Sequence, residues 1–73
     1  MKAWRVTWKG MVHIVVNASN SGARSKAFRV LKDTGWRPQY FAIRCVRAPE
    51  HDAWAATTRW ACVEESELKR EQS

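Results

Sequence analysis

Four residues of this chain are of the types that hold transition metals: His13, Cys45, His51 and Cys62. A structural zinc site needs four such side chains to converge, and they are usually presented as closely spaced pairs. No such pair occurs here, so the spacing does not indicate a metal centre. The sequence instead predicts a protein with no metal or other cofactor, whose two thiols are small apolar core residues in a reducing compartment.

His51 stands between Glu50 and Asp52, and these are residue types that carry out general acid–base chemistry. Such chemistry requires side chains that converge in a pocket, whereas adjacent residues on a strand or loop point in different directions. The sequence also has no serine in a nucleophile elbow and no glycine-rich phosphate loop. We therefore expect a non-catalytic protein.

Cations and aromatic residues are the remaining groups that could carry a function. Residues 1–49 hold ten Lys or Arg and one acidic residue, which gives a charge of +9. Residues 50–73 hold three Lys or Arg and six acidic residues, which gives a charge of −3. The excess of positive charge in residues 1–49 favours binding to an acidic partner. Arginine beside aromatic rings is typical of single-strand nucleic-acid binders, but the same residues are also enriched at protein–protein hot spots. The five tryptophans and the net charge of +6 leave both uses open.

Two strands with alternating or β-rich sequence, Ala3–Trp8 and Met11–Asn17, predict an N-terminal hairpin. A two-residue loop would pair Trp8 with Met11, and a three-residue loop would pair Trp8 with Val12. A slip of one residue moves every side chain to the other face, so we expect the register that collects the apolar side chains on one face. That register has the three-residue loop. Its apolar face would hold Trp4, Val6, Trp8, Val12, Ile14 and Val16.

A helix is predicted next, with a capping residue within Ser19–Ser21 and a stop at Gly35. Its apolar residues recur with helical spacing, and its opposite arc is basic. The apolar positions are Ala23, Ala27, Val30, Leu31 and Thr34, and the opposite arc holds Ser25, Lys26, Arg29, Lys32 and Asp33. A third strand is expected over Gln39–Arg47, with Phe41, Ile43 and Cys45 facing the helix.

The last part of the chain is less strongly patterned. Pro49 followed by Glu50 could open a helix, or Arg59–Val63 could form a fourth strand, and we favour the strand. Residues 64–73 have Leu68 as their one apolar side chain and are expected to be a frayed or short helical acidic tail.

The expected fold is one α+β domain over residues 1–63, followed by the tail 64–73. It has two layers, a mainly antiparallel sheet of three to four strands and one helix packed on one face, in the order β-β-α-β-β. The other face of the sheet would be open.

The candidate partner-binding residues lie on this open face, on the basic arc of the helix and in the turns. They are Arg5, Lys9, Arg24, Lys26, Arg29, Lys32, Arg37, Tyr40, Arg44 and Arg47. Among the tryptophans, Trp4 and Trp8 are expected in the core and Trp36 at the end of the helix, whereas Trp54 and Trp60 fall in the weakly patterned segment.

No run of residues approaches the length of a membrane span, and the N-terminus lacks the apolar segment of a signal peptide. A cytoplasmic location is therefore expected, with no membrane partner. An exposed edge strand could support a dimer, and the sequence leaves monomer and dimer open.

The segments Met1–Trp8 and Ile43–Glu50, and the late Arg59–Cys62 segment, resemble those of small phage-encoded proteins. In size and order of elements the chain is similar to type I anti-CRISPR proteins. That resemblance implies a non-catalytic inhibitor in the host cytoplasm that binds a CRISPR surveillance complex and blocks its hold on target DNA. The alternative is a small basic module that binds DNA or RNA directly, with an affinity that falls steeply with salt and with charge reversal at Lys26, Arg29 and Lys32.

Overall fold

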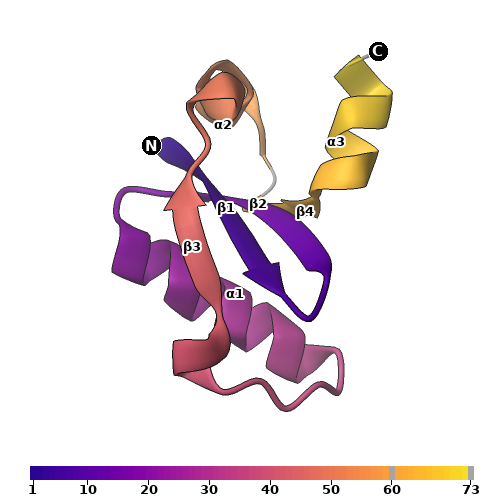
Figure 1. Cartoon of the computed structure of the whole chain (residues 1–73). Coiled ribbons are helices and arrows are strands. Elements are labelled where there is room, and N and C mark those ends of the chain that lie inside the picture. The colour runs from indigo at the N-terminus through magenta and orange to yellow at the C-terminus, as the bar shows by residue number, and fades with distance from the viewer. Residues whose placement is uncertain (60, 73) are drawn as a thin grey trace.

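The computed structural model describes residues 1–59 and 61–72, the last two as backbone only. Its centre is a four-stranded antiparallel sheet in the order β3-β1-β2-β4, so the expected α+β class with an antiparallel sheet is confirmed. The hairpin strands β1 (Lys2–Trp8) and β2 (Met11–Asn17) are central, and the edges are β3 (Arg44–Arg47) and β4 (Cys62–Glu64). Figure 1 shows helix α1 (Asn20–Asp33) at one end of the molecule and helices α2 (Asp52–Thr57) and α3 (Glu65–Gln72) at the other.

The hairpin has a two-residue loop, and the predicted three-residue loop is wrong. Trp8 pairs with Met11, and the loop residues Lys9 and Gly10 have φ angles of 46° and 79°. Two consecutive positive φ angles are the mark of a type I′ turn, whose twist matches that of the strands it joins. Gly10 adopts this left-handed conformation without the steric cost that a side chain would add.

The register prediction failed because both faces of the sheet carry a core. On the first face, Trp4, Val6 and Trp8 pack with Val15 and with α1. On the second face, Ile14 and Val16 are buried. The other buried residues of this second cluster are Ala3, Ala48, Ala55 and Leu68, so α2 and α3 cover part of the face that was expected to be open. The apolar residues of β2 therefore divide between two cores instead of joining the tryptophans.

Helix α1 confirms the sequence prediction closely. The Ser19 hydroxyl accepts a hydrogen bond from the Gly22 amide at 3.1 Å and caps the first turn. Its buried residues are Ala23, Ala27 and Leu31, which pack in the first core. The helix ends before a Gly35 with φ 93°, the usual C-terminal arrangement.

The third strand is shorter than predicted. A 3-10 helix, η1 (Tyr40–Ala42), takes its first half, and β3 begins only at Arg44, whose partner on β1 is Thr7. Because β1 ends at Trp8, one residue beyond Thr7, the residues before Ile43 have no strand opposite them. Phe41 therefore does not face the helix as predicted and is 81% exposed. Ile43 and Cys45 are buried as expected.

The segment after β3 contains both of the alternatives weighed from the sequence. A 3-10 helix, η2 (Pro49–His51), leads into α2, and a short strand β4 follows. The strand starts later than predicted, and Trp60 lies outside the described residues. Leu68 of α3 is 1% exposed and belongs to the second core. None of the helices in the described ranges is long and apolar enough to cross a bilayer.

Candidate functional site

A shallow hollow of about 390 Å³ lies between helix α1 and the 3-10 helix η1. It is bordered by two aromatic rings, two cations, a serine and an aspartate. Its lining residues are Ser25, Phe28, Arg29, Lys32, Asp33 and Tyr40. Together with Arg24, whose guanidinium lies over the Tyr40 ring, and Phe41, which follows Tyr40 in η1, they form what we call the α1–η1 surface.

Two aromatic rings organise the cations of this surface. Phe28 and Tyr40 meet edge to face, with 5.9 Å between ring centroids. The Arg24 guanidinium lies 5.7 Å from the centroid of the Tyr40 ring, and the Lys32 ammonium lies 5.5 Å from that of Phe28. Cations held over ring faces in this way are attracted by the ring quadrupole. The rings thus hold positive charge at the surface without neutralising it.

Hydrogen bonds fix η1 against α1. The Tyr40 hydroxyl lies 3.4 Å from both the carbonyl oxygen of Ser21 and the hydroxyl of Ser25. Near the start of α1, the Asn20 side chain donates to the carbonyl of Cys45 at 3.0 Å, and this bond joins α1 to β3. The hollow is therefore bounded by two elements that are tied together by hydrogen bonds.

The charge of the α1–η1 surface is largely uncompensated. Asp33 is the single acid among residues 1–49. Within the described parts of the chain, none of Arg24, Arg29 and Lys32 lies within ion-pairing distance of a carboxylate. The Nε atom of Arg24 is buried without a hydrogen-bond partner there. Three cations against one acid leave this surface able to receive anionic groups.

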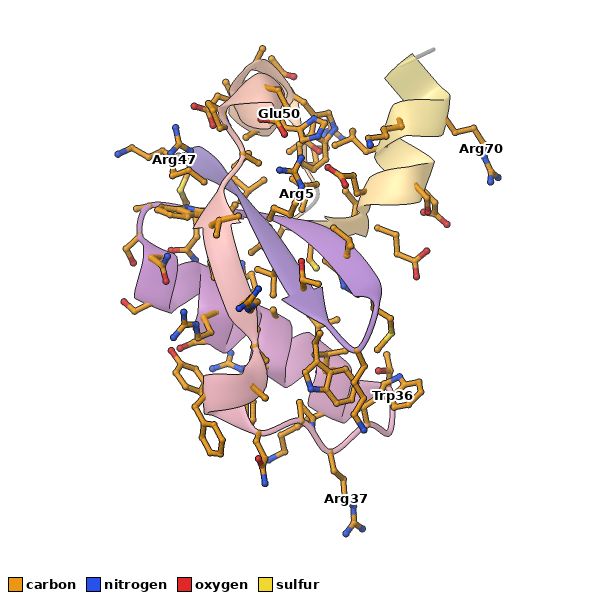
Figure 2. All side chains as sticks on the ribbon, in the orientation of Figure 1. Arg5, Trp36, Arg37, Arg47, Glu50 and Arg70 are labelled. Carbon is orange, nitrogen blue, oxygen red and sulfur yellow. The ribbon has the colours of Figure 1, made fainter. Side chains whose placement is uncertain are left out.

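Further candidates extend the same end of the molecule. Figure 2 shows Trp36 and Arg37 at the end opposite α2 and α3, with Arg37 pointing away from the fold. Trp36 is 48% exposed and meets the edge of Trp8 at 5.6 Å between centroids, and the Lys9 ammonium lies 5.2 Å from the Trp8 ring. These residues add positive charge and aromatic surface to the end of the molecule opposite α2 and α3.

Two candidates lie elsewhere. Lys26 borders an adjacent hollow, which Arg29 and Cys62 also line, and Arg44 is exposed on β3. Burial raises the pKa of the Cys62 thiol to about 11, and the charge of Lys26 acts in the opposite direction. The cations of the helix are therefore divided between two adjacent hollows, and Arg29 borders both.

Arg5 and Arg47 are occupied by acids of the second half of the chain. Arg5 donates to Glu65 from Nε at 3.0 Å and from Nη2 at 2.5 Å, and it also pairs with Glu50. Arg47 holds Asp52 through two bonds of 3.0 and 2.6 Å. Figure 2 shows Arg5 and Glu50 on the α2 side of the sheet. Both arginines join the sheet to the segments that cover its second face.

These pairs also shift the pKa values of the acids. Hydrogen bonds from Arg47 and from the backbone amide of Ala3 lower the pKa of Asp52 to about 2. The hydrogen bond from Arg5 lowers the pKa of Glu65. Each carboxylate is stabilised in its charged form by a nearby donor.

The sequence predicted that the side chains of Glu50 and His51 point in different directions, and this prediction is wrong. Glu50, His51 and Glu65 present ligand atoms within 4.8 Å of one another, and His51 is 4% exposed with its Nε2 atom 3.3 Å from Glu65. The 3-10 turn η2 and the packing of α3 bring them together. Arg5, however, already donates to both carboxylates. A metal ion would have to displace that guanidinium, so the cluster acts as an ion-pair network.

Comparison of the chain with known protein families, with curated proteins and with solved structures found no match. The site must therefore be judged from its own geometry. Sequence analysis had identified the cations and Tyr40 but missed Phe28, Phe41 and Asp33. Phe28 lies at the edge of the apolar arc of α1, and that position is the one sign in the sequence of a ring at the border of the site.

Proposed function

We propose that this protein is a non-catalytic nucleic-acid-binding domain and that its α1–η1 surface contacts the phosphate backbone. The observation that carries the proposal is a set of three cations, Arg24, Arg29 and Lys32, which have no carboxylate partner among the described residues and lie around a hollow with aromatic walls. Cations supply the sequence-independent part of nucleic-acid affinity, and aromatic rings offer surfaces to the bases.

The distribution of charge supports the same conclusion. Glu50, Asp52 and Glu65 pair with Arg5 and Arg47 on the side of the sheet covered by α2 and α3. The cations of α1 have no such partners among the described residues. A protein with unbalanced positive charge on one side attracts a polyanion to that side and orients it during approach.

A second candidate is the inhibitor of a CRISPR surveillance complex that the resemblance implies. Exposed Trp36 beside Arg37 is a composition found at protein–protein hot spots. A channel that holds DNA is itself basic, however, and would repel the α1–η1 surface. The inhibitor would therefore have to contact an acidic surface of the complex or the nucleic acid that the complex carries.

The direct test is binding to labelled DNA and RNA oligonucleotides, followed by fluorescence anisotropy over a range of salt concentrations. If three cations each neutralise one phosphate, the logarithm of affinity falls with the logarithm of salt with a slope of about −2 to −3. Absence of binding at low salt would contradict the proposal. Co-elution with a surveillance complex that persists after nuclease treatment would favour the inhibitor instead.

A further inference from the structure

We infer that the α1–η1 surface selects single-stranded nucleic acid, with one base stacked on Phe41 and the next base in the hollow beside Tyr40. This inference rests on the proposed nucleic-acid function and adds the class of ligand. It follows from three features of the surface: a free aromatic ring, a carboxylate within a basic site, and the position of the cations around the hollow.

Phe41 is the free ring. It is 81% exposed, and within the described ranges neither an aromatic ring nor a cation stacks on it. Its backbone is fixed by η1, where the Ala42 amide donates to Gln39 at 2.9 Å and the Ile43 amide donates to Tyr40 at 3.2 Å. The neighbouring Ile43 is 1% exposed and anchors the turn in the core. The fold thus presents a large apolar ring to solvent on an anchored support, which suits stacking against a base.

Asp33 distinguishes bases from phosphates. A carboxylate in the lining of the hollow repels phosphate, but it accepts hydrogen bonds from the amino groups of bases. The hydroxyl of Ser25, on the same lining, can either donate or accept. The hollow therefore favours the polar edge of a base, and the phosphates are left to the cations at its border.

The cations lie around the hollow, where they can contact the sugar-phosphate backbone on either side of a base bound in it. Arg24 lies over Tyr40, Lys32 lies over Phe28, and Arg29 borders the hollow from α1. A volume of about 390 Å³ is within the size range of small-ligand sites. Phosphates on these cations and a base in the hollow can therefore be bound together.

Duplex nucleic acid does not satisfy this arrangement. In a duplex each base face is covered by its neighbour, so Phe41 has nothing on which to stack. Duplex binding through α1 in a groove would use the cations alone and leave the rings without a role. Bases of a single strand are free to turn outward and stack on protein rings.

The test compares three labelled ligands of equal length with the full-length protein: a single strand, a duplex, and a single strand of abasic sugar-phosphate. Anisotropy at one low salt concentration should show the single strand binding more tightly than both others. The variant Phe41→Ala should lose single-strand affinity by roughly 5- to 150-fold, the range that corresponds to one stacked base. Its affinity for the abasic strand should not change.

Two further variants separate stacking from other causes. Phe41→Tyr keeps a ring and should retain single-strand affinity. Val46→Ala shortens another exposed apolar side chain, 54% exposed on β3, and should bind as the parent protein does. Because Phe41 and Val46 are both exposed, all three variants should fold, which circular dichroism verifies.

The inference is overturned if the abasic strand or the duplex binds as tightly as the single strand, or if Phe41→Ala leaves single-strand affinity unchanged. In each of those cases nucleic-acid binding itself survives. If the proposed nucleic-acid function itself is wrong, the result is different, because none of the three ligands then binds.

Discussion

Replacement of Leu68 by alanine should destabilise the whole domain, although Leu68 lies only five residues before the last residue of the sequence. It is 1% exposed and is the sole buried residue of α3 in the part whose side chains are described. Its cluster includes Ala3, Ile14 and Ala55, which lie on two central strands and on α2. Truncation of Leu68 therefore opens a gap in the cluster where α3 packs with β1, β2 and α2.

The size of the effect follows from the position of the gap. Truncation of buried leucine costs about 2–5 kcal/mol, with the lower values at sites that can relax. Helix α3 is at the periphery and can shift, so we expect about 2–3 kcal/mol here. For a domain of this size, 1 kcal/mol changes the melting temperature by about 4–8 °C, and the expected loss is about 8–24 °C.

Urea and thermal unfolding followed by circular dichroism would measure this loss. The matched control is Glu67→Ala, an exposed residue of the same helix, whose effect should stay within about 0.5 kcal/mol. If Leu68→Ala is no less stable than this control, α3 does not pack on the sheet in solution. The explanation given above for the hairpin register would then be refuted.

Two more predictions concern the turn and the ion pairs. Gly10→Ala should cost about 1 kcal/mol in urea unfolding, because φ is 79° there, and a neutral result would contradict the two-residue turn. The pKa values of Glu65 and Asp52 are lower in the folded state than their ordinary values of 4.5 and 3.8, so their stabilisation is complete above those values and is lost as the pH falls toward 2. The double variant Glu65→Gln, Asp52→Asn should flatten this acid decline in urea unfolding measured at successive pH values, and an unchanged decline would show that Arg5 and Arg47 do not hold these acids in solution.

Elements with strong local signals were predicted well. The bounds of α1 follow from a capping serine, a regular apolar spacing and a glycine that adopts a positive φ after its end. The hairpin register could not be obtained in the same way. It depends on whether the second face of the sheet is covered, and that is decided by Ala55 and Leu68, which lie far along the chain from β2.

The candidate site was likewise predicted only in part from the sequence. Helical periodicity was enough to place Arg29 and Lys32 on the outer arc of α1. It could not show that Arg5 is paired with Glu65, because that contact joins residues 60 positions apart. The exposure of Phe41 was also missed, because an alternating segment reads equally well as a strand where no partner strand is available.

The most direct measurement of nucleic-acid binding by the α1–η1 surface is a comparison of two charge reversals, Arg29→Glu and Lys2→Glu. Both residues are exposed, and both variants change the net charge by the same amount. Lys2 begins β1 near the N-terminus, which Figure 1 shows beside α2 and away from η1.

Arg29→Glu should weaken single-strand binding about tenfold and make the salt slope shallower by about 0.7 to 1, because a phosphate contact is lost. Lys2→Glu should change the affinity much less and leave the slope nearly unaltered. Equal losses in the two variants, or no loss in Arg29→Glu, would contradict the assignment of the α1–η1 surface as the nucleic-acid site.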